Sequence, residues 1–103
     1  MTQINDKLAA ALGLAMRAGR VRSGELAAVS AVRSGKAFAA VLDEEASEST
    51  KKHWSEICKR AGVPLYFAGG VGRAIGREAH MIAAITDKGF ALMIERAQNG
   101  EHS

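Results

Sequence analysis

The chain has 103 residues, of which 48% are hydrophobic and one is cysteine. This length is typical of one domain, and this hydrophobic content excludes a chain that is disordered over long stretches. The net charge is +3 and the pI about 9.4, so a basic face for nucleic acid and an ordinary solvated surface are both open. We expect a single domain over residues 1–98 and a frayed tail at residues 99–103.

Apolar residues at helical spacing predict a first amphipathic helix over residues 4–18, which Gly19 ends in a left-handed conformation. A very short extended segment follows at residues 20–22. Ser23 has the residue type of an N-cap, and it predicts a second helix with Glu25 in its first turn and Gly35 at its end. The apolar run at residues 37–43 predicts a strand that is covered on both faces.

The second half of the chain continues this alternation. Ser47 predicts the cap of a third helix, which ends near Gly62 and is followed by a strand at residues 63–68. A short helix at residues 71–76, a strand at residues 80–86 and a last helix capped by Asp87 complete the pattern. This order predicts an α/β fold, a three-layer α/β/α sandwich around a four-stranded mixed sheet.

No residues in the sequence have the spacing of a catalytic or metal site. Its histidines and Cys58 show no metal-ligand pairing, and Cys58 falls at an apolar helical position that predicts a buried, inert thiol. The acidic residues at 43–48 are expected to form a solvated cap at a strand end. We therefore expect no catalysis, cofactor or metal. The apolar run near the N-terminus, about ten residues long, is too short to span a membrane. The single cysteine cannot pair within the chain and indicates a reducing compartment, so we expect a cytoplasmic protein.

The arginine-rich stretch before the second helix is the strongest candidate site. Arg20 and Arg22 are expected on the same face of the short strand, beside backbone N–H groups of Ser23, Gly24 and Glu25 at the helix N-terminus. Such amides and guanidinium groups suit a phosphate. An N-cap followed by a helix with surface arginines explains the same residues, and both interpretations stay open at this point.

Four motifs in order resemble the kink-turn-binding ribosomal protein superfamily of the L7Ae/L30e type, and most closely its small bacterial members. The motifs are LGLAMRAGRVRSGE, AVRSGKAFAAVLDEEASESTKK, GRAIGR and AAITDKGFA, and the resemblance covers about nine tenths of the chain. It implies an α/β/α sandwich, no catalysis and binding to structured RNA, including ribosomal RNA.

The family's RNA-binding members carry a Gly-x-Asn-Glu-x-x-Lys pattern at the start of the second helix, whose Asn and Glu read base edges. The matching residues here are Gly24, Leu26, Ala27 and Ser30, so only the glycine is retained and base readout is expected to be weakened. The resemblance leaves residues that follow the RNA backbone: Arg20, Arg22, the amides of Gly24 and Glu25, Arg33, Lys36, and a second region with Gly72, Arg73, Arg77 and His80.

Two functional hypotheses follow. The first is a non-enzymatic protein that binds structured, kink-turn-like or ribosomal RNA through this positive face. The second is a protein-interaction module that kept the fold, with a protein partner on the second helix. Leu26 and Val29 motivate the second hypothesis, because the resemblance places both side chains in solvent. A slightly rotated helix that buries both residues is the alternative.

Overall fold

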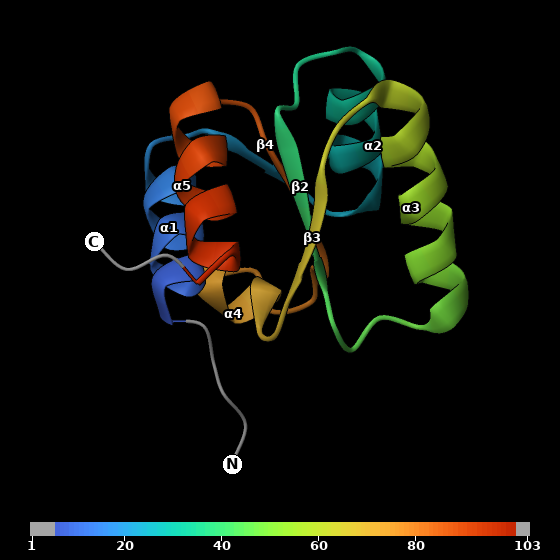
Figure 1. The fold of residues 1–103 in the computed structure, drawn as a ribbon. Coiled ribbons are helices and arrows are strands. Elements are labelled where there is room, and N and C mark those ends of the chain that lie inside the picture. The colour runs from blue at the N-terminus through green and yellow to red at the C-terminus, as the bar shows by residue number, and fades with distance from the viewer. Residues whose placement is uncertain (1–5, 101–103) are drawn as a thin grey trace.

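The computed structural model describes residues 6–100. Over this range the chain alternates helices and strands in the order expected (Figure 1). The elements are α1 (Asp6–Arg17), β1 (Val21–Ser23), α2 (Glu25–Arg33), β2 (Ala39–Asp43), α3 (Glu48–Ala61), β3 (Leu65–Ala68), α4 (Val71–Ile75), β4 (Ile82–Ile85) and α5 (Lys88–Gln98).

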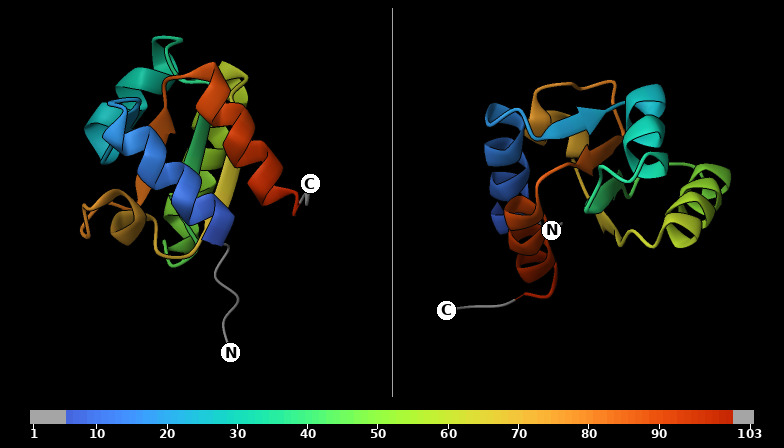
Figure 2. Two further views of the ribbon diagram at one scale, coloured as in Figure 1. Left: turned by 90° about the vertical axis from the view of Figure 1, so that its left-hand side faces the viewer. Right: turned by 90° about the horizontal axis from the view of Figure 1, so that it is seen from above.

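The four strands form one mixed sheet in the order β1-β4-β2-β3. β2 and β3 are parallel, whereas β4 runs antiparallel to both of its neighbours, β1 and β2. Helices α1 and α5 cover one face of the sheet and α2 and α3 the other (Figure 2). The predicted three-layer α/β/α sandwich with a four-stranded mixed sheet is confirmed, and β1 and β3 are its two edges.

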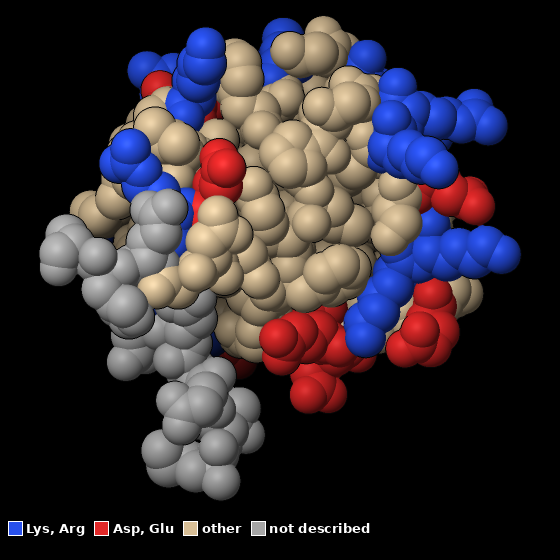
Figure 3. Space-filling view, in the orientation of Figure 1, with Lys and Arg blue, Asp and Glu red and all other residues tan. Residues whose placement is uncertain are grey.

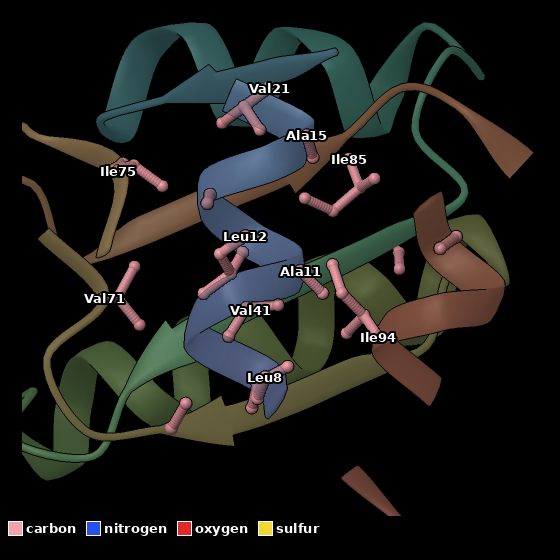
Figure 4. Packing of buried hydrophobic residues seen from close by; sticks show 14 of the residues in the cluster. Leu8, Ala11, Leu12, Ala15, Val21, Val41, Val71, Ile75, Ile85 and Ile94 are labelled. Atoms are coloured by element: carbon pink, nitrogen blue, oxygen red, sulfur yellow. The ribbon is translucent and has the colours of Figure 1, made fainter. Parts of the chain in front are cut away.

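Each face of the sheet has its own apolar core, because alternate residues of a strand point to opposite faces. Val41 and Ile85 pack against α1 and α5, whereas Leu42 and Ile82 pack against α2 and α3 around the fully buried Trp54. Figure 4 shows the first of these clusters, where side chains from α1, β2 and α5 lie together. All five residues of β2 are buried, which confirms that this strand is covered on both faces.

The helix caps agree with the sequence in most cases. The side chain of Ser47 accepts a hydrogen bond from the amide of Thr50, and that of Asp87 from the amide of Phe90. Gly19 has the predicted left-handed conformation, and Gly62, where the third helix was expected to end, has it as well. The strands are shorter than the apolar runs because buried residues such as Ala37 and Val63 precede the paired segments. Residues 4 and 5 of the predicted first helix and residues 101–103 of the predicted tail lie outside the described range.

Cys58 is buried on α3 as predicted, and burial raises its pKa to about 11. Because the thiolate is the nucleophilic form, this thiol is inert near neutral pH. Among the helices within residues 6–100, none combines the length and the apolar character needed to cross a membrane.

Candidate nucleic-acid interface

The predicted phosphate site lies where β1 passes into α2. Gly24 connects the two elements with φ 86° and ψ 160°, a conformation that favours glycine. Its N–H donates to the carbonyl of Ile82 at 3.0 Å, so pairing with the β4 side continues one residue past β1. The N-cap of α2 is therefore Gly24. The prediction of Ser23 as the cap is wrong, and so is that of a free amide at Gly24.

Ser23 has a different partner, which joins two distant parts of the chain. Its hydroxyl oxygen lies 2.7 Å from Nδ1 of His80, 57 residues later. A Cβ atom at Gly24 would lie 3.2 Å from the nearest atom of the same imidazole ring, so the ring covers the glycine closely. The structure thus brings together the two regions that the resemblance selected, the start of α2 and the loop that ends at His80.

Three backbone amides remain at the start of α2, those of Glu25, Leu26 and Ala27. The first turn of an α-helix has no carbonyl acceptors for these groups, and Gly24 has no side chain that caps them. The N-terminal end of a helix also carries a partial positive charge. This arrangement has the chemistry that binds an anion such as a phosphate group.

The carboxylate of Glu25 turns toward α3 and has a structural role. Its Oε2 accepts a hydrogen bond of 3.0 Å from Nε1 of the buried Trp54, and its Oε1 lies 3.7 Å from Nε2 of His53. An indole N–H that is buried without an acceptor is destabilising. The Glu25 carboxylate therefore links the start of α2 to α3 by a hydrogen bond. Only the backbone amide of Glu25 belongs to the candidate interface.

Arg20 and Arg22 lie beside this helix start, with exposed side chains. Arg22 is in β1, and its Nη1 donates to the carbonyls of Val21 at 3.1 Å and Gly19 at 3.4 Å. Arg20 precedes β1, and its carbonyl accepts from the amide of Thr86 at 2.9 Å. The prediction that both arginines project from the strand is therefore wrong for Arg20, although both residues precede the start of α2 by a few positions.

The residues at the positions of the family's Asn, Glu and Lys are all exposed on α2: Leu26, Ala27 and Ser30. Leu26 is 88% exposed. Val29 is half-buried and packs against the core between the sheet and α3. The expectation that Leu26 and Val29 both face solvent therefore holds for Leu26 alone, and the rotated-helix alternative fails for Leu26.

Arg33 and Lys36 lie at the opposite end of α2. The nine residues of the helix span about 13 Å, so these two cations are separated from the amides of the first turn. Arg33 instead lines a surface pocket with Arg60 and His53 of α3. The structure therefore does not gather all the predicted cations at one point.

The second predicted region is built around a buried glycine. A Cβ atom at Gly72 would lie 2.6 Å from the carbonyl oxygen of Arg77 and 2.8 Å from that of His80, closer than two such atoms approach. The amide of Arg77 also donates to the carbonyl of Gly72 at 2.8 Å. Gly72 therefore lies directly against the backbone of the loop that ends at His80. Arg73 and Arg77 have exposed side chains.

Asp43, which sequence reasoning placed in a solvated cap, is the one charged residue buried within residues 7–100. Its Oδ2 accepts a hydrogen bond from the amide of Val71 at 3.0 Å, and its Oδ1 from the amide of Glu45 at 2.8 Å. The prediction is wrong because the start of α4, 28 residues later, closes over this carboxylate. Asp43 thereby holds the helix that carries Arg73, and no local signal in the sequence indicates this contact.

No group of three or more His, Cys, Asp or Glu side chains that could hold a metal ion occurs in the part of the chain that the structure describes.

Comparison with known proteins places these features in a family. The model of the ribosomal protein L7Ae/L30e/S12e/Gadd45 family matches residues 6–94. The chain is 40% identical over 83 residues to the RNA-binding protein YlxQ of Bacillus subtilis (strain 168), which covers 78% of this chain and 83% of that protein. It is 34% identical over 83 residues to the RNA-binding protein YlxQ of Enterococcus faecium, with 78% and 80% covered.

Solved structures show the same fold. A protein with unknown function from Bacillus halodurans C superimposes with a TM-score of 0.84 and 30% identity, over 90% of this chain and 97% of that one. The Giardia lamblia 15.5kD RNA binding protein superimposes with a TM-score of 0.75 and 18% identity, over 97% and 89% of the two chains. The family resemblance predicted from the motifs is thus confirmed: the chain belongs to the ribosomal protein L7Ae/L30e/S12e/Gadd45 family.

Proposed function

We propose that this protein is a non-enzymatic RNA-binding protein that acts in the cytoplasm on structured, kink-turn-like RNA, and that ribosomal RNA is its target. One observation carries the proposal. The hydrogen bond between Ser23 and His80 joins the end of β1, beside the uncapped amides of α2, to the loop after α4, and both segments carry exposed arginines. The names of the two YlxQ relatives, which describe RNA-binding proteins, support it.

In this proposal the interface grips the RNA backbone. The amides of Glu25, Leu26 and Ala27 bind one phosphate, and exposed guanidinium groups on either side bind its neighbours. The guanidinium groups are those of Arg20, Arg22, Arg73 and Arg77. Arg33 and Lys36 contact a more distant part of the same RNA.

Base readout is weakened in this proposal. Leu26 and Ala27 have no side-chain donor or acceptor for a base edge, and Ser30 carries no charge. Phosphate contacts position a protein without reading sequence. Selectivity for a kinked RNA over a straight one then comes from where the two arginine groups lie, because a kink brings phosphates of separate strands within reach of both.

A titration of the purified protein with a kink-turn RNA and with a plain duplex of equal length, at two salt concentrations, tests the proposal. Neutralisation of about four phosphates by the four arginines predicts a slope of log affinity against log salt of roughly −3 to −3.6, which contacts by Arg33 and Lys36 would make steeper. Arg22→Ala should weaken binding and reduce the steepness of the slope by just under one unit. Arg96→Ala, which removes an equal charge from the last turn of α5 on the opposite face of the sheet from α2 (Figure 2), is the matched control and should leave both values unchanged.

Preference for the kink-turn supports recognition of backbone shape. Equal affinity for the two RNAs contradicts the kink-turn part of the proposal and leaves a general RNA binder. An affinity that does not change with salt, or equal effects of Arg22→Ala and Arg96→Ala, contradicts the proposed interface itself.

The exposure of Leu26 favours one alternative function, a docking site for a protein partner on α2. At 88% exposure this leucine costs solubility without stabilising the core. The alternative predicts that a pull-down after nuclease treatment still recovers a protein, and that Leu26→Asp abolishes the recovery. Recovery that is lost on nuclease treatment contradicts it.

A further inference from the structure

We propose that the cavity between α2 and α3 binds a phosphate group, at a site separate from the start of α2. The two helices lie side by side on one face of the sheet (Figure 1), and the cavity between them has a volume of about 410 Å³. Sites of this size hold small ligands in proteins. The lining residues come from the last turn of α2 and from one face of α3: Arg33, His53, Glu56, Ile57, Arg60 and Ala61.

The directions of α2 and α3 bring their last turns together. In the first turn of α2, Glu25 accepts a hydrogen bond from Trp54 of α3. Arg33 follows about 12 Å further along α2, and Arg60 follows about 9 Å further along α3. The two arginines therefore reach the same cavity from different helices.

The α3 residues that line the cavity share one face of the helix, because they recur at helical spacing from His53 to Ala61. Ile57, at the centre of this face, is 6% exposed and belongs to the core between the sheet and α3. His53 and Arg60 are exposed on either side of it. The cavity therefore has an apolar inner wall and hydrogen-bond donors at its mouth.

The guanidinium groups of Arg33 and Arg60 have no carboxylate partner within residues 6–100. Glu56, the one carboxylate among the lining residues, forms an ion pair with neither arginine. A guanidinium group presents a planar fork of N–H donors that matches the oxygens of a phosphate. Two such groups at one cavity therefore favour a phosphate over a neutral ligand.

The position of both arginines at helix ends has a simpler explanation. Each lies in the last turn of its helix, where the free carbonyl groups favour a cation. Lys59 lies in the same last turn of α3 but does not line the cavity. An interaction with the helix end alone therefore predicts equal roles for Lys59 and Arg60, whereas a phosphate in the cavity predicts a role for Arg60 only.

The RNA backbone is the source of this phosphate, and this part of the inference rests on the proposed function. α2 is about 13 Å long, and a nucleic-acid strand carries a phosphate on every nucleotide, so one strand spans the distance from the amides at the start of α2 to Arg33. In Figure 3, Lys and Arg side chains project from the upper right margin of the molecule, beside the last turn of α3 in Figure 1. A free nucleotide offers the same phosphate chemistry, and competition separates the two sources.

NMR titration of the full chain with inorganic phosphate, at constant ionic strength, tests the cavity itself. The side-chain Nε–Hε signal of Arg33 should shift and reach saturation. Arg60→Ala should weaken this binding by about tenfold, whereas the matched control Lys59→Ala should leave it unchanged. A signal that does not shift, or equal losses in the two variants, overturns the proposal.

Titration with kink-turn RNA tests the source of the phosphate. Arg60→Ala should weaken RNA binding and reduce the steepness of its salt dependence by just under one unit. Arg60→Lys keeps the charge and loses the planar fork, so it should weaken binding without a change in slope. Unchanged RNA affinity in both variants overturns the RNA backbone as the source, and displacement of inorganic phosphate by a 5′-mononucleotide then assigns the cavity to a free nucleotide.

Arg22→Ala and Arg60→Ala separate the two proposed sites. Weaker RNA binding in Arg22→Ala alone contradicts the RNA contact of the cavity and retains the interface at the start of α2. Weaker binding in Arg60→Ala alone contradicts that interface and retains the cavity. Both side chains are exposed, so circular dichroism of each variant should match that of the wild type.

Discussion

The replacement of Asp43 by alanine tests the most consequential contact that the sequence did not reveal. The carboxylate is 7% exposed and accepts two backbone hydrogen bonds, from Val71 and from Glu45. Hydrogen bonds to charged groups contribute about 1.5–3 kcal/mol each. In Asp43→Ala the amide of the buried Val71 loses its acceptor, whereas that of the exposed Glu45 gains water. We therefore expect a loss of about 3 kcal/mol in the free energy of unfolding.

Urea denaturation measures this loss directly, and thermal unfolding should show a decrease in Tm of roughly 15 °C for a domain of this size. Asp43→Asn keeps one acceptor oxygen, so it should lose about half as much stability. Glu45→Ala is the matched control, because it removes a neighbouring exposed carboxylate and leaves the backbone amide in place. Its effect should stay within about 0.5 kcal/mol.

The same variant should also weaken RNA binding through α4. Because Asp43 holds the amide of Val71 at the start of this helix, its loss releases the segment that carries Arg73. Stability of Asp43→Ala equal to that of Glu45→Ala would refute the reasoning, since the two hydrogen bonds would then not contribute in solution. Lost stability with RNA affinity unchanged would separate the fold of α4 from the proposed interface.

Three further predictions concern the start of α2 and Cys58. Gly24→Ala places a side chain at a positive φ and against His80, and it should lower the free energy of unfolding by about 1–3 kcal/mol. Urea denaturation of Gly24→Ala with and without His80→Ala separates the backbone strain from the contact with the imidazole ring. Full stability of Gly24→Ala would contradict this prediction. The family's Asn, Glu and Lys can be restored on the exposed face of α2 by Leu26→Asn, Ala27→Glu and Ser30→Lys. This variant should prefer kink-turn RNA over duplex by about 1–3 kcal/mol more than the wild type in the same titration. An equal gain in affinity for both RNAs would point to charge alone. Burial raises the pKa of Cys58 from 9.0 to about 11, so about one thiol in a thousand is thiolate at pH 8, and a thiol reagent should react slowly until denaturant unfolds the chain. Because the folded pKa is the higher one, the stability that this thiol contributes is present below pH 9 and is lost as the pH rises toward 11, a loss that Cys58→Ala should not show.

The elements of the fold follow from short-range patterns. The caps at Ser47 and Asp87 and the left-handed glycines act within a few residues, so the sequence around each position predicts them. The family motifs predicted the same fold class. The prediction that Ser23 caps α2 is wrong because its hydroxyl pairs with His80, 57 residues away. Pairing of Gly24 with Ile82 extends the strand by one residue, so the N-cap is Gly24.

The candidate interface was predictable in its parts and not in its assembly. The residues that flank Gly24, and the region from Gly72 to His80, were selected from the motifs. Their adjacency depends on β4, which lies between β2 and β1 in the sheet and pairs with both. The separate roles of the Glu25 carboxylate and the Glu25 amide could not be predicted from the sequence, because the indole of Trp54 that donates to the carboxylate lies on another helix.

The sequence by itself determined the alternation of helices and strands, the buried central strand, the inert thiol and the family, because apolar spacing and motifs are properties of neighbouring residues. Only the tertiary structure decided the strand order, the burial of Asp43 under α4, the cover of His80 over Gly24 and the open edge at β3. Each of these depends on which segments meet in space, and contacts between residues far apart in the chain leave no local pattern to read.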